Sequence, residues 1–302
     1  MPNILIAIVS LAVLIKSAGI FIDQSTALAK KIRISSFLVG FTLLALGTSL
    51  PDLVISSYSA AKGFPEIAIS TLLGSAIVKT SLVLGILALF TNYKLAEIDI
   101  KRNIPINLII FTLFFVLLLL FGFQMTSVMG ILTLLILGLS IFLAKENNHT
   151  ITIQSKDRFN LLFFLLSFGL LIISGKLCVD NISIFANSYG IAQTTIGYFI
   201  LAIGTSIPEL VTSLTIIKKG NLQLALGNFL GSILFDILFV SGISSFFSIL
   251  NFKPFLLEFL FLMLATTIFM LFAILGKRYY ISKKEGIGLI LVYILFILVQ
   301  SL

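Results

Sequence analysis

The sequence predicts an all-α integral membrane protein: ten transmembrane helices in two five-helix halves of inverted topology. Three observations predict this fold: an apolar composition, apolar segments of helix-spanning length, and an internal repeat. Of the 302 residues, 59% are hydrophobic and 11% are charged, and the mean hydropathy is +1.19. A soluble domain carries roughly a quarter charged residues, so the composition favours a chain that spans the lipid bilayer many times.

Ten apolar segments are long enough to cross a bilayer as helices. A transmembrane helix needs about 20 apolar residues, whereas a barrel strand needs only about 9–11 and alternates polar with apolar residues. The segments cover residues 4–22, 36–61, 66–90, 104–122, 126–144, 159–186, 193–217, 223–249, 254–275 and 285–301. Almost nothing remains for a soluble domain.

The loops between these segments differ sharply in basic residues. Even-numbered loops hold only Lys62 and Lys253, whereas odd-numbered loops hold Lys30, Lys31, Arg33, Lys94, Lys101, Arg102, Lys145, Lys156, Arg158, Lys218, Lys219, Lys277, Arg278, Lys283 and Lys284. Positive charge stays in the cytoplasm. We therefore expect a multi-pass protein of the cell (inner) membrane. Its odd-numbered loops should be cytoplasmic, and both of its termini should lie outside. Topology also explains the net charge of +8 better than nucleic-acid binding does.

The internal repeat has a constant offset of 157 residues. Residues 40–54, GFTLLALGTSLPDLV, match residues 197–211, GYFILAIGTSIPELV, and the same offset relates Gly74-Ser75 to Gly231-Ser232. Because five helices separate the copies, they should run in opposite directions through the bilayer. We expect a first half at 1–145, a cytoplasmic connecting loop at 146–158 and a second half at 159–302. Inverted repeats with interrupted helices are typical of secondary transporters.

Each copy of the repeat places Gly-Thr-Ser, a proline and an acid near the middle of an apolar segment. Proline removes a backbone donor and clashes with the preceding turn, so the helices are predicted to open near Pro51 and Pro208. Carbonyls such as those of Ala45 and Ala202 would then face a cavity. Carbonyl, hydroxyl and carboxylate oxygens suit hard cations such as calcium and sodium.

Asp52, Glu209 and Asp236 are the acidic residues well inside the apolar segments. Burying such a charge costs about 2.5–3.5 kcal/mol on insertion scales. Converging carboxylates repel one another unless a cation neutralises them. One site could therefore hold either one divalent ion or several monovalent ions, but not both, as antiport requires. The alternative is that these carboxylates are structural and pair with intramembrane lysines.

The paired Gly-Thr-Ser-hydrophobic-Pro-acid motifs, together with Gly227-Asn228-x-x-Gly231-Ser232 and the following Asp236, resemble the sodium/calcium exchanger family, a part of the cation/calcium antiporter superfamily, in its prokaryotic ten-helix form. The resemblance covers essentially the whole chain. It implies sodium/calcium antiport by alternating access at a mid-membrane carboxylate site. Transport would be electrogenic, with sliding of the first and sixth helices and with no ATP or permanently bound cofactor.

The resemblance also implies which residues bind the ions. Asp52 and Glu209 would coordinate calcium, and Asp236 would be a further acidic residue of the site. Sodium and calcium sites would be completed by Thr48, Ser49, Thr205, Ser206, Ser75, Ser232 and the carbonyls of Ala45 and Ala202.

The sequence departs from the family pattern in three respects. Asp52 stands where the family usually has Glu, Ser70-Thr71 replaces Gly-Asn in the first copy, and Lys79 stands where the family usually has Asn or Asp. A lysine at this depth must pair, lose its proton or snorkel. We expect Lys79, which is equivalent to Asp236, to form an ion pair with Asp52 or Asp236 across the repeat interface. The site would then carry a charge of −2, which suits one calcium ion and fewer coupled sodium ions.

Lys79 leaves three possibilities open: exchange of calcium against fewer sodium ions, exchange of calcium or another cation against protons, or a diverged paralogue that no longer transports. Other classes fit less well. An enzyme needs a nucleophile–base pair or a two-metal constellation, and the membrane segments contain no histidine. A channel can select cations with Asp rings but does not need inverted repeats. A structural membrane protein has no need for a repeated acidic helix centre. No obligate protein partner is indicated.

Overall fold

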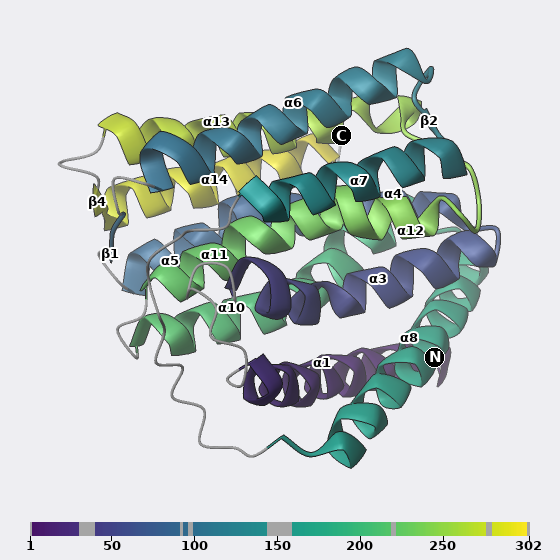
Figure 1. The fold of residues 1–302 in the computed structure, drawn as a ribbon. Helices are drawn as coiled ribbons and strands as arrows, with labels where there is room; N and C mark the ends of the chain where they lie inside the picture. The colour runs from purple at the N-terminus through teal and green to yellow at the C-terminus, as the bar shows by residue number, and fades with distance from the viewer. Residues whose placement is uncertain are drawn as a thin grey trace.

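The computed structural model describes residues 2–29, 40–90, 93–95, 99–143, 159–218, 222–275 and 280–300. These residues are almost entirely helical, and the helices lie alongside one another in a bundle (Figure 1). The prediction of an all-α fold is confirmed. The predicted connecting loop at 146–158 lies outside the described residues.

The first half contains five contiguous helical segments. They are α1 (Pro2–Ala29); η1 (Gly40–Leu44) with α3 (Ala45–Ala61); α4 (Pro65–Ile77) with η2 (Val78–Val83) and α5 (Leu84–Phe90); η3 (Asp99–Asn103) with α6 (Ile104–Leu120); and α7 (Ser127–Leu143). η1, η2 and η3 are π-helical turns within the longer segments.

The second half repeats this order. Its segments are α8 (Leu161–Tyr189); α9 (Gln193–Ile196) with η4 (Gly197–Leu201) and α10 (Ala202–Lys218); α11 (Leu222–Leu234) with η5 (Phe235–Val240) and α12 (Ser241–Ser244); the 3-10 turn η6 (Lys253–Phe255) with α13 (Leu256–Leu275); and α14 (Lys283–Gln300). The π-helical turns η4 and η5 fall at the positions equivalent to η1 and η2.

Two short antiparallel strand pairs mark the opposite ends of the bundle (Figure 1). β1 (Tyr93–Lys94) pairs with β4 (Tyr280–Ile281) at one end, and β2 (Gln124–Met125) pairs with β3 (Leu250–Asn251) at the other. Both chain termini lie toward the β2–β3 end.

Eight helical segments of the described residues are long and apolar enough to cross a membrane. α7 is apolar but has only 17 residues, and α14 begins with three charged residues, Lys283, Lys284 and Glu285. Ten crossings therefore remain a prediction, although each of the ten predicted segments overlaps a helical segment in the described part of the chain.

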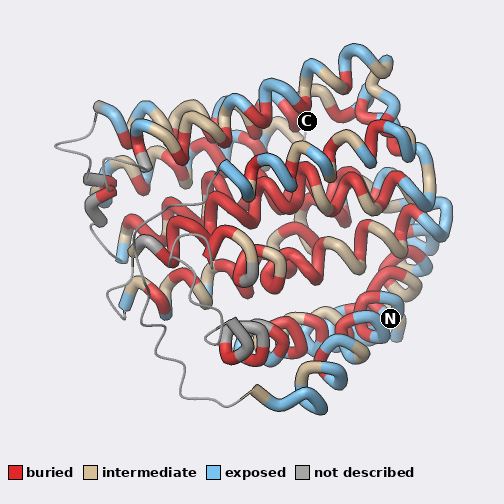
Figure 2. The backbone as a smooth tube through the Cα atoms, in the orientation of Figure 1, coloured by how far each residue is buried: buried red, intermediate tan, exposed pale blue. Residues whose placement is uncertain are grey.

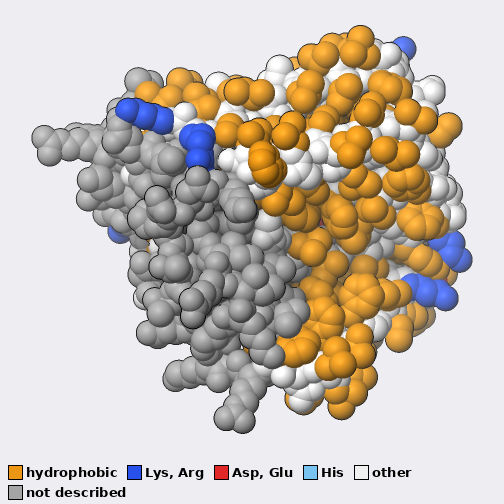
Figure 3. Space-filling model, in the orientation of Figure 1, with side chains coloured by type: hydrophobic (Ala, Val, Ile, Leu, Met, Phe, Trp, Pro, Cys, Tyr) orange, Lys and Arg blue, Asp and Glu red, His pale blue; other side chains and the backbone are white. Residues whose placement is uncertain are grey.

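The outer surface of the bundle is apolar, whereas buried polar side chains gather inside it. Leu120 and Phe142 are 75% and 71% exposed. Figure 3 shows orange hydrophobic side chains across the middle of the visible face, with lysine and arginine toward its ends. Figure 2 shows that α3, α4 and α11 are buried over most of their length, whereas the outer helices are exposed on one side. This distribution suits a lipid solvent.

The two copies of the repeat pack against each other through reciprocal close contacts. A Cβ atom placed on Gly40 would lie 2.7 Å from the backbone nitrogen of Asn228, and one on Gly197 would lie 3.0 Å from that of Thr71. Each contact becomes the other when residue numbers are shifted by 157. Because a Cβ essentially never comes so close to another chain atom, small residues let the backbones of the two halves meet at the centre of the molecule.

The prediction that the helices open near the two prolines is wrong. α3 and α10 continue through Pro51 and Pro208, and the irregular turns are η1 and η4, directly before these helices. The carbonyls of Ala45 and Ala202 already accept hydrogen bonds, from Thr48 at 3.2 Å and from Ser206 at 2.7 Å. Hydroxyl groups of the motif thus donate to backbone carbonyls in the first turn of each helix.

Candidate ion-binding site

Four charged side chains meet at the centre of the bundle, each from a different helical segment. Asp52 comes from α3, Lys79 from η2, Glu209 from α10 and Asp236 from η5. All four residues have a relative exposure of 0%. The π-helical turns η2 and η5 carry the lysine and one aspartate, so the irregular backbone lies where the charged side chains converge.

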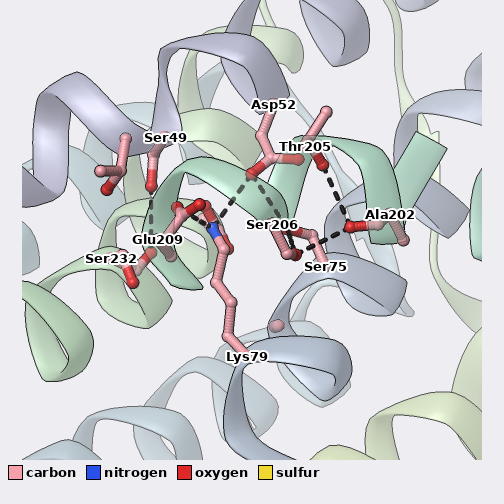
Figure 4. Close-up of polar contacts among 12 residues, drawn as sticks. Ser49, Asp52, Ser75, Lys79, Ala202, Thr205, Ser206, Glu209 and Ser232 are labelled. Atoms are coloured by element: carbon pink, nitrogen blue, oxygen red, sulfur yellow. Dashed lines mark hydrogen bonds and ion pairs between the residues drawn. The ribbon is translucent and has the colours of Figure 1, made fainter. Parts of the chain in front are cut away.

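Lys79 forms ion pairs with all three carboxylates. Its Nζ lies 3.0 Å from Oδ2 of Asp52, 2.8 Å from Oε1 of Glu209 and 2.6 Å from Oδ2 of Asp236. Figure 4 shows the lysine side chain reaching from its helix into the group of acidic residues. The predicted ion pair across the repeat interface is confirmed. The contact with Glu209 goes beyond it, since the repeat alone relates Lys79 only to Asp236.

Each carboxylate keeps one oxygen without a partner. Oδ1 of Asp52, Oε2 of Glu209 and Oδ1 of Asp236 are buried and have no hydrogen-bond partner among the residues that the structure describes. Buried acceptors of this kind are rare in folded proteins. Three such oxygens around a single ammonium leave the centre of the bundle rich in buried acceptors.

Serine hydroxyls line two sides of this centre, as Figure 4 shows. On one side, Ser75 Oγ donates to Oδ2 of Asp52 at 2.9 Å and lies 3.3 Å from Oγ of Ser206. On the other, Ser49 Oγ donates to the carbonyl of Ser232 at 3.3 Å. The offset of 157 exchanges the two pairs, so the site has the approximate twofold symmetry of the repeat.

The two threonines of the motifs turn toward backbone carbonyls. Thr205 Oγ1 donates to the carbonyl of Leu201 at 2.9 Å. Thr48 Oγ1 donates to the carbonyl of Ala45 at 3.2 Å and lies 3.5 Å from the side-chain Oδ1 of Asn228. Asn228 in turn donates to Ser213 Oγ at 3.4 Å. Asn228 belongs to the Gly-Asn-x-x-Gly-Ser motif, but the motif alone did not indicate a role for its side chain. The signal was the Gly-Asn pair itself, which the first copy lacks.

The three carboxylates do not by themselves form a metal site in this arrangement. Within the described ranges, no group of three His, Cys, Asp or Glu side chains has the arrangement needed to hold a metal ion. The ammonium of Lys79 instead lies between the carboxylates. A calcium ion could use these oxygens only after Nζ moves aside.

A helical bundle with an apolar exterior, reciprocal packing of an internal repeat and a buried, oxygen-rich charged site defines the class of membrane cation transporters. The sequence profile described as sodium/calcium exchanger protein matches residues 2–145 and 159–302. The chain therefore belongs to the sodium/calcium exchanger family, whose members are cation/calcium antiporters and not enzymes. They transport sodium and calcium without a permanently bound cofactor.

Named relatives agree with this assignment. The chain is 31% identical to a putative antiporter, CaxA, of Alkalimonas amylolytica, with 95% of both chains covered. It is 28% identical to the sodium/calcium exchanger MaX1 of Methanosarcina acetivorans, with 98% of both covered. Among solved structures, it matches the sodium-calcium exchanger NCX_Mj, soaked with 2.5 mM Na+ and 0.1 mM Ca2+, at 25% identity and a TM-score of 0.73, covering 98% of both chains.

Proposed function

We propose that this protein exchanges calcium for sodium by alternating access at the site around Lys79, and that it couples fewer sodium ions to each calcium than a site without this lysine would. The observation that carries the proposal is the convergence of Asp52, Glu209 and Asp236 on one buried point between the two repeats. Converging carboxylates favour either one divalent ion or several monovalent ions. This competition is the basis of antiport.

The candidate calcium ligands are oxygens that this arrangement brings together. Asp52 and Glu209 would bind calcium directly and Asp236 would contribute to the same site, because each has a buried oxygen without a partner. Calcium takes about 6–8 oxygen ligands. The remaining ligands for calcium and sodium would be drawn from Thr48, Ser49, Ser75, Thr205, Ser206, Ser232 and the carbonyls of Ala45 and Ala202.

Calcium binding requires the ammonium of Lys79 to shift. Two cations in direct contact with the same carboxylate oxygens would repel each other strongly in this buried site. Lysine carries its charge on a flexible four-carbon stem, so Nζ can move without displacing the helix. A polar position next to the site lies beside Ser75, whose hydroxyl donates to the same Asp52 oxygen that Nζ contacts.

For alternating access, we propose that α1 and α8 slide across the core helices. These two helices pack side by side: the Phe21 and Phe164 rings lie 4.6 Å apart, and Gln24 accepts a hydrogen bond from the backbone nitrogen of Asn160 at 2.7 Å. Both helices have apolar, exposed outer faces. They can therefore move within lipid without exposing the buried polar centre.

For localisation, we propose the cell membrane, with the β1–β4 end of the bundle in the cytoplasm and both termini outside. The cytoplasmic assignment of that end is supported by Lys94 in β1 and by Lys283 and Lys284 directly after β4. Positive charge accumulates on the cytoplasmic side. The β2–β3 end, which would lie outside the cell, carries Lys253 beside β3.

The proposal can be tested by calcium uptake into proteoliposomes loaded with sodium. An outward sodium gradient should drive uptake, and Glu209→Gln should abolish it. The matched control is Glu258→Gln, because Glu258 is also buried but pairs with Gln300 away from the site, at 2.8 Å. Uptake driven only by a pH gradient would indicate proton coupling instead. Absence of uptake under both gradients would contradict antiport.

A further inference from the structure

With all three carboxylates ionised and the Lys79 amine protonated, the site has a net charge of −2. Three carboxylates surround one ammonium, and every one of the four side chains is fully buried. The lysine is held by all three acids at once, at 2.6–3.0 Å. Separating a buried charge from its partners is strongly unfavourable, so the ammonium should remain within the site throughout the transport cycle.

A site that is closed to water on both sides must be close to neutral. A net charge enclosed at this depth has neither solvent nor counter-ions to stabilise it. A residual charge of −2 is balanced by one calcium ion or by two monovalent cations. A third monovalent cation would leave the closed site positively charged.

The hydroxyl groups of Ser75 and Ser206 form a polar position beside the carboxylates. Either the Lys79 ammonium or a monovalent ion could occupy this position. Ser75 uses its single proton toward Asp52, and Ser206 uses its own toward the carbonyl of Ala202. A serine has only one proton to donate. The two hydroxyl oxygens lie 3.3 Å apart. When both protons are used in this way, each oxygen has lone pairs free to accept, and a cation beside them can contact both.

We propose that Lys79 is a tethered substitute for one of the driving cations, so that exchange is electroneutral, with two sodium ions for each calcium ion. The ammonium would occupy the carboxylate centre when calcium is absent and the Ser75–Ser206 side when calcium is bound. This inference rests on the proposed exchange function and deepens it. It departs from the electrogenic transport that family resemblance implies.

The first test is the calcium gradient that the wild-type protein reaches in proteoliposomes at zero membrane potential. With a tenfold sodium gradient, coupling to two sodium ions concentrates calcium about 100-fold, whereas coupling to three concentrates it about 1,000-fold, since each sodium ion contributes a factor of ten. We expect the value near 100-fold. The value near 1,000-fold would overturn the inference.

The second test sets the membrane potential with potassium and valinomycin under the same sodium gradient. An electroneutral cycle should give the same final calcium gradient at 0 and at about 100 mV of either sign, whereas moving one net charge would change it by about 50-fold. A shift of that size would overturn electroneutrality but leave sodium/calcium exchange intact. Absence of any sodium-driven calcium uptake would instead reject the proposed function itself.

Variants at position 79 test whether Lys79 determines the voltage dependence of the calcium gradient. Lys79→Asn leaves three carboxylates without the ammonium, so a third monovalent cation is needed and the calcium gradient should become sensitive to voltage. Lys79→Arg keeps the charge and should stay insensitive. The matched control is Lys176→Asn, which removes an exposed lysine of α8. An active Lys79→Asn protein that ignores voltage would contradict the inference, and the wild-type measurements decide it if that variant does not fold.

Discussion

Lys79 and Asp236 occupy equivalent positions of the two repeats, and Nζ of Lys79 lies 2.6 Å from Oδ2 of Asp236. Two symmetry-related positions thus meet near the centre of the molecule and carry opposite charges. Two aspartates in these places would repel each other. The lysine converts the repulsion into an ion pair and lowers the negative charge that transported ions must balance.

Asp236→Asn should reduce calcium transport strongly without unfolding the protein. The substitution lowers the negative charge of the site by one, so one calcium ion would leave it positively charged. Lys79 would still be held by Asp52 and Glu209, at 3.0 and 2.8 Å. We expect initial calcium uptake to fall by at least about tenfold, the change that corresponds to 1.4 kcal/mol.

Thermal unfolding in detergent accompanies this measurement and separates loss of function from loss of fold. Glu258→Gln again provides the control, since it removes a buried carboxylate that contacts Gln300 instead of Lys79. Unchanged uptake in a folded Asp236→Asn protein would show that this carboxylate does not take part in calcium binding.

Ser75→Ala should weaken sodium coupling more than calcium binding. Its hydroxyl donates to Asp52 at 2.9 Å and faces Ser206 at 3.3 Å. A hydrogen bond to a charged group contributes about 1.5–3 kcal/mol, so the sodium concentration for half-maximal exchange should rise by roughly tenfold or more.

Ser140→Ala is the matched control for this experiment. Ser140 is also buried, but it donates to the carbonyl of Leu137 within α7, outside the site. The sodium dependence of Ser140→Ala should match that of the wild type. Equal shifts in the two variants would point to a general packing effect instead of a role of Ser75 at the site.

Much of the fold follows from the sequence because its determinants are local. Apolar segment length sets where the helices lie, and each predicted segment coincides with a helix of the described chain. The offset of 157 places Lys79 opposite Asp236, and this pairing is correct. Glu209 could not be assigned to the same lysine, because that contact depends on how far α10 is rotated and shifted against η2.

The continuous helices at Pro51 and Pro208 could not be predicted from the residue pattern. Counting the lost donor of Pro51 and the steric clash predicts an open helix, but α3 and α10 continue through their prolines, and Thr48 and Ser206 donate to the carbonyls of Ala45 and Ala202 in the first turn of each helix. Their effect depends on side-chain rotamers, which the residue pattern does not specify. The same limitation hid Asn228, whose contacts with α3 and α10 exist only in the packed structure.

Gly231→Ala should separate the two repeats. A Cβ at this position would lie 2.4 Å from the carbonyl oxygen of Phe41 and 2.8 Å from Cβ of Ala45. Overpacking of a tight contact costs about 1–3 kcal/mol, which outweighs the roughly 0.5–1 kcal/mol that alanine gains over glycine in a helix. We expect a lower midpoint of thermal unfolding in detergent, together with reduced calcium uptake.

Gly138→Ala tests whether this effect is specific to the contact. Gly138 lies in α7, and a Cβ there would meet nothing within 4 Å. The variant should unfold at the same temperature as the wild type or slightly higher. Destabilisation of Gly138→Ala to the same extent would mean that helix interiors in this protein tolerate no added methyl group, whatever their packing.

Tyr58→Phe should loosen α8 from the core helix α3. The phenol of Tyr58 donates to both carboxylate oxygens of Asp180, at 3.1 and 3.2 Å, and this hydrogen bond links the two helices. Hydrogen bonds to charged groups contribute about 1.5–3 kcal/mol. Loss of this amount from one conformation would shift a two-state equilibrium by a factor of roughly 10 or more toward the other.

Distances between spin labels on α3 and α8 report this shift directly. The α3–α8 distance of the structure in Figure 1 should lose population in Tyr58→Phe. Tyr189→Phe should leave the distribution unchanged, because Tyr189 is 55% exposed and its ring lies against Phe185 of the same helix. If the Tyr58 variant keeps the wild-type distribution, the Tyr58–Asp180 bond does not control the position of α8. If its population moves and its exchange rate changes with it, motion of α8 against α3 is a step of the transport cycle.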